Sequence, residues 1–179
     1  MKSVLISIHP EWCELIASGK KTLEVRKTMP KIPWPFKAYI YCTKNKKGWF
    51  HFGKKERLDG KVIGEFVCDS IRCFDVPYPA FRNEMSRSIL EQSCLTYYQL
   101  HRYAYHDNLY GWHISDLKIY DKPKPLSEFY KECAGLDNTG MCYECEYAVG
   151  EECDCAVNGR LHLTRPPQSW CYVEELKDG

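Results

Sequence analysis

The pattern of apolar and polar positions over residues 8–29 predicts a short helix that leads directly into a strand. Pro10 suits the first turn of a helix, where its missing N–H group would have no partner. Trp12 and Ile16 lie at helical spacing and would face the same side. Gly19 then ends the helix, because glycine tolerates the left-handed conformation common just past a helix. Beyond it, the helical period gives way to strict alternation.

This alternation gives the expected strand one apolar and one polar face. Leu23 and Val25 would share the apolar face. The polar face would carry Thr22, Glu24, Arg26 and Thr28, and Lys20 and Lys21 lie at the bend before the strand. Lys27, next to Arg26, is a further candidate for ligand contact. Two interpretations are open: a solvated face with a Glu24–Arg26 ion pair, or a row of functional groups facing a ligand.

The rest of the chain predicts a mixed α+β fold. Residues 4–8 form an apolar run typical of a buried strand, and residues 88–105 are expected to form the longest helix. Ser88 and Glu91 fit a capping box at the start of that helix. Further strands are expected over residues 37–43, 61–69, 109–120 and 169–175. The length of 179 residues suits one domain.

Charge is distributed unevenly behind a formal net charge of +1. Residues 20–61 hold 13 Lys or Arg against 3 acids, a local net of +10, and the remainder holds 12 against 21, a net of −9. A basic third of this kind suits nucleic acid or another phosphate-bearing partner, although a soluble lysine-rich loop would look the same.

Four residues outside the expected helix and strand are further candidates for ligand contact: Thr43, Trp49, Trp112 and His113. Trp49 belongs to a basic loop over residues 44–60 in which aromatic residues alternate with lysines, as in single-stranded nucleic-acid binders. The alternative is that these aromatics pack into the core. His113 beside Trp112 is equally open to a structural role.

Glu65 is a candidate acid or base on the strand over residues 61–69. It lies between Ile63 and Val67 on one face, so burial of its carboxyl is expected. Desolvation raises the pKa of a carboxyl group, and such groups cluster at functional sites. An exposed glutamate on a strand face is the alternative.

Residues 133–155 form a cysteine-rich insert within this domain. Cys142 and Cys145 have the spacing of a zinc half-site, and Cys153 and Cys155 would complete it, with Cys133 as an alternative ligand. A structural zinc ion is therefore a candidate cofactor, and no cofactor is needed for the chemistry considered below. A disordered acidic loop and a redox pair are the rival interpretations.

The helix–strand segment resembles the ASCH domain family. The resemblance rests on Gly19-Lys-Lys-Thr-Leu-Glu-Val-Arg26, entered from a Pro-x-Trp helix, and is clearest over residues 3–43. Shorter similarities follow at Val62-Ile-Gly-Glu-Phe, Tyr110-Gly-Trp-His-Ile and Pro166-Pro-Gln-Ser-Trp-Cys-Tyr-Val. The resemblance implies a small PUA-like β-barrel flanked by helices, and the cysteine-rich insert is not part of the family pattern.

By this resemblance the protein would bind RNA or a modified nucleoside in a basic, aromatic-lined cleft. Some ASCH proteins instead hydrolyse the amide of N4-acetylcytidine with a lysine, a threonine three residues later and a glutamate on a later strand. Those positions correspond to Lys21, Glu24 and Glu65 here, so the nucleophile position holds a carboxylate. A general-base role for Glu24 would be needed, and a ribonuclease is a further alternative.

No secretory signal is expected, because the apolar run over residues 4–8 is too short for one, and no run could cross a bilayer. The chain is therefore expected to be cytoplasmic, without a membrane partner and with its 11 cysteines mostly reduced.

Overall fold

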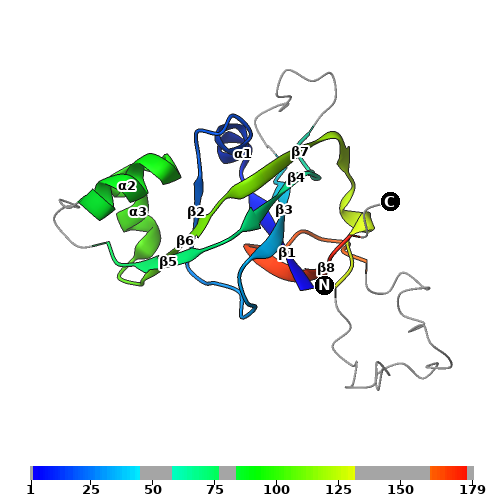
Figure 1. Cartoon of the computed structure of the whole chain (residues 1–179). Helices are drawn as coiled ribbons and strands as arrows, with labels where there is room; N and C mark the ends of the chain where they lie inside the picture. Colours follow the sequence, from blue (N-terminus) through cyan, green and yellow to red (C-terminus); the bar gives the residue numbers. More distant parts are fainter. Residues whose placement is uncertain (1, 45–57, 77–83, 132–161, 177–179) are drawn as a thin grey trace.

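The computed structural model describes residues 2–44, 58–76, 84–131 and 162–176. In these segments, eight strands form two sheets and three α-helices pack around them (Figure 1). The strands are β1 (Lys2–Ile8), β2 (Leu23–Arg26), β3 (Phe36–Cys42), β4 (Lys61–Cys68), β5 (Ile71–Phe74), β6 (Leu109–His113), β7 (Ser115–Lys124) and β8 (Trp170–Glu174). The helices are α1 (Pro10–Ala17), α2 (Glu84–Ser93) and α3 (Tyr97–Ala104), with a 3-10 turn η1 (Leu126–Glu128).

The larger sheet has five strands in the order β7-β4-β3-β1-β8. Its centre is the parallel pair β1–β3, with Val4 opposite Ala38 and Ile8 opposite Cys42. Both faces of β1 are covered: Ile6 joins the core beneath α1, whereas Leu5 packs with Phe129 on the opposite face. Burial on both faces explains why the first strand is a continuous apolar run without alternation.

The smaller sheet has three strands in the order β2-β6-β5. Leu23 and Val25 of β2 pack against Ile89 of α2 and Leu100 of α3. These two helices consequently cover the apolar face that the alternation predicted, at one end of the molecule (Figure 1).

The α+β class is confirmed, but the predicted closed barrel is wrong. One long hairpin bends from the five-stranded sheet into the three-stranded sheet: β4 pairs with β7, and β5 pairs with β6. The bend falls at Ser70 and Ile114, where the His113 N–H donates to the Ser70 carbonyl at 3.0 Å. Because the hairpin divides between two sheets, β7 and β8 remain edges of the larger one.

Two predicted elements need correction. The expected helix over residues 88–105 is two helices, because Cys94 takes a left-handed conformation with φ 54° after α2 ends. The capping box lies at Thr96 and Gln99, at the start of α3, instead of at Ser88 and Glu91. The expected strand over residues 109–120 is likewise divided, at Ile114.

Candidate functional site

A cavity of about 910 Å³ opens between β1, β2, α3 and the segment before β8. It is lined by Ser7, Ile8, His9, Trp12, Lys21, Glu24, Val25, Arg26, Lys27, Thr28, Thr43, Leu95, Gln99, Tyr103, Pro166, Pro167, Gln168 and Ser169. Its volume falls within the range of small-molecule sites. The polar face of β2 thus faces a partly enclosed space instead of bulk water.

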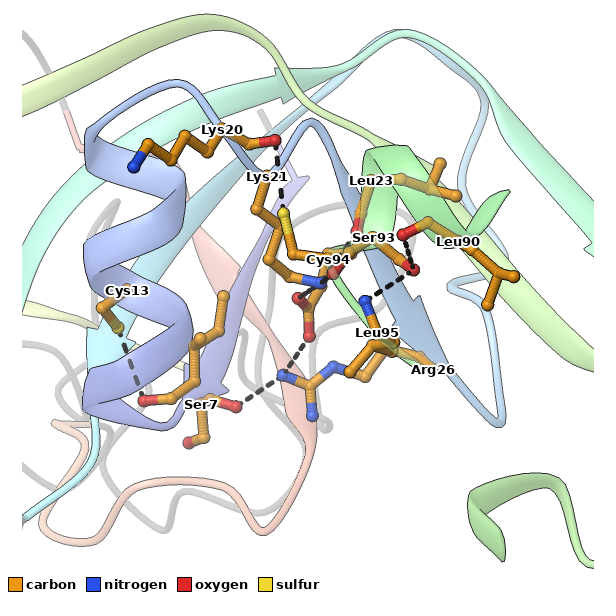
Figure 2. A network of polar contacts seen from close by, with 12 residues as sticks. Ser7, Cys13, Lys20, Lys21, Leu23, Arg26, Leu90, Ser93, Cys94 and Leu95 are labelled. Atoms are coloured by element: carbon orange, nitrogen blue, oxygen red, sulfur yellow. Dashed lines mark hydrogen bonds and ion pairs between the residues drawn. The ribbon is translucent and has the colours of Figure 1, made fainter. Parts of the chain in front are cut away.

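Lys21 is a buried ammonium group on the wall of this cavity. Its Nζ donates to the Leu23 carbonyl at 2.9 Å and to the Ser93 carbonyl at 2.7 Å. It also lies 3.4 Å from Glu24 Oε2, and Figure 2 shows it directed toward Ser93 at the end of α2. An ammonium group has three N–H donors. Two of them serve the carbonyls, and the charge of the group pairs with Glu24.

Arg26 pairs with the other oxygen of the same carboxylate. Its Nη2 lies 3.0 Å from Glu24 Oε1 and donates to the Ser7 carbonyl at 2.6 Å (Figure 2). The pair predicted from the sequence is present but buried, with the side chains of Arg26 and Glu24 11% and 8% exposed. Arg26 Nε is buried without a hydrogen-bond partner among the described residues, and Nη1 makes no hydrogen bond with any of them. Nη1, in contrast to the buried Nε, is therefore the group through which Arg26 retains donor capacity beside the cavity.

The remaining charges give the cavity a positive wall. The lining contains three cationic residues and one carboxylate, so their formal charges sum to +2: Lys21, Arg26 and Lys27 against Glu24. Lys27 pairs at 3.7 Å with the exposed Asp107 and lies 5.6 Å from the centre of the Tyr103 ring. Anionic or electron-rich ligands would be favoured here.

Two aromatic rings and a hydroxyl–imidazole pair complete the lining. Trp12 lies beneath the Lys21 ammonium, 5.5 Å from ring centre to Nζ, and Tyr103 lines the cavity from α3. Thr43 Oγ1 lies 3.3 Å from His9 Nδ1. His9, Tyr103 and Gln99 were not predicted as cavity residues. Tyr103 and Gln99 belong to α3, which the sequence pattern did not connect with β2, and His9 directly precedes α1, where no pattern marked it as a ligand contact.

The C-terminal segment closes one side of the cavity. Ser7 Oγ donates to the Pro167 carbonyl at 2.6 Å, and the Ser7 N–H donates to the Ser169 carbonyl at 2.9 Å. Trp170 Nε1 donates to Thr28 Oγ1 at 3.0 Å. The two side-chain bonds join residues that are 160 and 142 positions apart in the sequence.

The structure brings together five of the predicted site residues: Lys21, Glu24, Arg26, Lys27 and Thr43. Lys20 and Thr22 do not line the cavity. Lys20 is exposed, and the Thr22 backbone instead bonds to Gln92 and Ile114.

Glu65 does not join this cluster. Its carboxylate lies 3.6 Å from Lys37 and accepts a hydrogen bond from Tyr120, and it does not line the cavity. The expected partial burial is present, with a side chain 15% exposed, but the partners are those of a second network that includes Glu175, 3.1 Å from Lys37. Burial of Glu65 therefore serves an ion pair on the larger sheet.

Trp112 and His113 also lie away from the cavity. Trp112 is completely buried and packs edge-to-face with Phe36 and Trp170, so a ligand cannot reach it. His113 Nδ1 lies 2.7 Å from Asp69 Oδ1 at the surface. Burial disfavours the Asp69 carboxylate, yet the hydrogen bond and charge of His113 hold the pKa of Asp69 below its usual value.

The predicted zinc ligands Cys133, Cys142, Cys145, Cys153 and Cys155 lie outside the described residues, as does Trp49. Over the described segments, no group of three or more His, Cys, Asp or Glu could hold a metal ion. The zinc site therefore stays a prediction. In the same segments, no helix has the length and apolar character to span a membrane.

A thiol near the cavity is poorly suited to act as a nucleophile. Cys13 of α1 is fully buried, and its Sγ donates to the Ile8 carbonyl at 3.5 Å. Burial, reinforced by the hydrogen bond and charge of Cys42, raises the pKa of Cys13 well above its usual value. The thiolate, which is the reactive form, is thereby disfavoured.

Comparison with known families gives a match for part of the chain. Residues 6–72, which run from β1 into β5, match the ASCH domain, and the resemblance seen in the sequence is confirmed over this part of the chain. ASCH domains have a PUA-like fold often linked to RNA binding.

Solved structures extend the agreement in fold to nearly the whole chain. An ASCH protein from Zymomonas mobilis superposes with a TM-score of 0.60 at 19% sequence identity, over 97% of this chain and 88% of that chain. A tyrosine-to-phenylalanine mutant of a Zymomonas mobilis ASCH protein gives a TM-score of 0.57 at 18% identity, over 98% and 92% of the two chains. At these identities the likeness shows the fold alone. No curated protein matches the sequence.

Proposed function

We propose that this protein binds RNA or a modified nucleoside, with a base in the cavity described above. The observation that carries the proposal is the combination of a cavity of about 910 Å³ with a net positive wall and the rings of Trp12 and Tyr103. Aromatic rings stack on bases, and cations attract the phosphates beside them. Arg26 would offer its Nη1 donors to a carbonyl oxygen of the base.

The state of Lys21 favours binding over catalysis. In a hydrolase whose general base is Glu24, this ammonium group would have to stabilise an oxyanion. Two of its donors already serve the Leu23 and Ser93 carbonyls, and its charge pairs with Glu24 at 3.4 Å. One of these contacts would have to break in every reaction cycle, and a buried carbonyl or carboxylate would lose its partner. A structural role that positions Glu24 needs no such change.

Calorimetric titration with the four common ribonucleosides, N4-acetylcytidine and a ten-nucleotide single-stranded RNA tests the proposal. Arg26→Gln should lower the affinity about tenfold or more, since a charge-assisted hydrogen bond is lost. Arg72→Gln is the matched control, because Arg72 is an exposed residue of β5 that does not line the cavity. Tyr103→Leu provides a second test that leaves the buried charges intact.

Two results would contradict this function. One is the absence of binding to the entire panel at millimolar concentration. The other is an equal loss of affinity in Arg26→Gln and Arg72→Gln, with no effect of Tyr103→Leu. Either result would remove the cavity as the binding site.

An amidohydrolase acting on N4-acylated cytidine is the second candidate. It is favoured by the 3.4 Å Lys21–Glu24 pair at the cavity wall, at the two sequence positions that the family resemblance implies. Glu24 would take a proton from water, the hydroxide would add to the acyl carbon, and the C–N bond would break with proton transfer to the departing amine. Glu65 cannot supply that proton, because it belongs to the Lys37 network.

Turnover of N4-acetylcytidine to cytidine and acetate, read by mass spectrometry, decides between the two functions. Product formed by the wild-type protein and lost in Glu24→Gln would establish the hydrolase. Binding of N4-acetylcytidine without product would leave the protein as a binding module. A ribonuclease has no specific support in the described residues, and incubation of the ten-nucleotide RNA in the same assay tests it.

A further inference from the structure

A second, smaller cavity adjoins the first. It has a volume of about 340 Å³ and is lined by Tyr41, Thr43, Lys44, Gly60, Leu126, Thr164 and Pro166. Thr43 and Pro166 line both cavities. The two cavities therefore adjoin at these two residues.

The polar groups of the second cavity suit an anion. Lys44 supplies an ammonium group, and Thr43 and Thr164 supply hydroxyls. No carboxylate is among the described residues that line it. Leu126 and the buried Tyr41 form apolar parts of the lining. An ammonium group next to hydroxyl donors is a common arrangement for holding phosphate.

Lys44 differs from the cations of the first cavity, each of which pairs with a carboxylate. Lys21 and Arg26 both pair with Glu24, and Lys27 pairs with Asp107. Lys44 makes no ion pair or hydrogen bond within the part of the chain that the structure describes. Its charge is therefore available to a ligand.

The stem of Lys44 rests on Gly60, which fixes its course beside the cavity. A Cβ atom placed on Gly60 would lie 3.2 Å from Lys44 Cγ and 3.3 Å from Lys44 Cε. Gly60 has φ +82°, and its N–H donates to the Cys42 carbonyl at 2.7 Å. The glycine thus serves both the turn before β4 and the close approach of the lysine stem.

We propose that the second cavity is a phosphate subsite, so that the ligand of this protein is a nucleotide or an RNA strand in preference to a free nucleoside. The inference rests on the proposed function, because it places a base in the first cavity and the phosphate next to it in the second. Thr43, at the junction, would contact the link between the two.

Titration of the four common ribonucleosides and of their 3′- and 5′-monophosphates tests this subsite. One series of monophosphates should bind about tenfold tighter than the nucleosides or better, as expected for a charge-assisted contact. Lys44→Ala should abolish this gain and leave nucleoside affinity unchanged, whereas Lys44→Arg should retain most of it. Lys122→Ala is the matched control, since Lys122 is an exposed residue of β7 outside both cavities.

Salt dependence supplies a second readout. For an RNA ligand, the slope of log affinity against log salt should become shallower by about 0.7 in Lys44→Ala, the value for one phosphate contact on a single strand. The slope should not change in Lys122→Ala.

Failure of the subsite and failure of the proposed function give different results. If nucleosides bind but neither series of monophosphates binds more tightly, the subsite is refuted and the base site stands. The same conclusion follows if Lys44→Ala and Lys122→Ala lower affinity equally. If no nucleoside or monophosphate binds the wild-type protein, both proposals fall.

Discussion

Lys21 combines burial with a complete set of partners, so its removal should be costly. In Lys21→Met, two carbonyl groups and the Glu24 carboxylate lose their contacts with the ammonium group. We expect the free energy of unfolding to fall by about 2–4 kcal/mol, measured by urea denaturation. Lys20→Met, at the exposed neighbour, should change it by no more than about 0.5 kcal/mol.

A double-mutant cycle separates the lost ion pair from lost packing. Lys21→Met combined with Glu24→Gln should be less destabilising than the sum of the single changes, because each substitution leaves the other side chain without its partner. Simple additivity of the two losses would show that the Lys21–Glu24 pair contributes nothing to stability.

The Asp69–His113 pair should give a small pH-dependent contribution to stability. The pKa of Asp69 is lowered below its reference of 3.8 in the folded protein, so the stabilisation is complete above pH 3.8 and is lost as pH falls through the lower folded value. The pair is largely exposed, which limits the effect to about 0.2–1 kcal/mol. Asp69→Asn should show this deficit at about pH 5, and the deficit should be smaller at about pH 2, measured by urea denaturation. A constant deficit at both pH values would exclude the ionised Asp69 as its cause.

At the scale of single residues, the sequence predicted which polar groups share a face better than it predicted what those groups contact. Alternation placed Glu24 and Arg26 on one face, and the structure confirms their pairing. Alternation could not show that this face looks into a cavity, because the opposite wall comes from α3 and residues 166–169. Glu65 was expected to be partly buried, as it is, but burial alone did not reveal its partner Lys37.

At the scale of the element, the break between α2 and α3 shows how local capping decides where a helix begins. Both Ser88 and Thr96 are followed three residues later by a residue that can complete a capping box. Of the two, Thr96 is the one that caps a helix: Gln99 N–H donates to Thr96 Oγ1 at 3.3 Å, and Thr96 N–H donates to Gln99 Oε1 at 2.8 Å. The left-handed turn at Cys94 was not visible in the sequence, since cysteine rarely adopts it.

Thr96→Ala should lower the free energy of unfolding by about 1 kcal/mol, because α3 loses its cap. Thr96→Ser should retain most of the stability. Ser88→Ala should have a smaller effect, since Ser88 lies within α2 and accepts a side-chain hydrogen bond from Gln92 at 2.8 Å. Urea denaturation compares the three variants. A larger loss in Ser88→Ala than in Thr96→Ala would contradict the observed helix boundaries.

At the scale of the whole molecule, the larger sheet depends on close approach between its neighbouring strands β4 and β7. A Cβ atom on Gly64 would lie 2.4 Å from the Lys118 carbonyl oxygen, so Gly64→Ala should force the strands apart and cost about 2–4 kcal/mol. Gly19→Ala is the matched comparison: φ is +73° and no described atom lies within 4 Å, so only conformational strain of about 1–2 kcal/mol is expected. Thermal or urea unfolding measures both. Equal losses would show that contact at Gly64 is relieved without strand movement.

The division of the strands into two sheets could not be predicted from the sequence, because it depends on contacts between distant strands. The chain alternates through both halves of the long hairpin, and nothing in the alternation marks Ser70 and Ile114 as the place where it passes from one sheet to the other. The short strand β5 was missed altogether, because its four residues, Ile-Arg-Cys-Phe, are too few to establish a period. The α+β class followed from local patterns, whereas closure or separation of sheets depends on contacts between distant strands.

The bonds from Ser7 to Pro167 and Ser169 have a consequence for biosynthesis. Because translation proceeds from the N-terminus, β1, α1 and β2 emerge from the ribosome long before the segment that closes the cavity beside them. A nascent chain that ends before residue 166 lacks one wall of the cavity. Ligand binding by ribosome-stalled chains of increasing length should therefore begin only after this segment has left the exit tunnel, which would make the ligand a reporter of the emergence of residues 166–169.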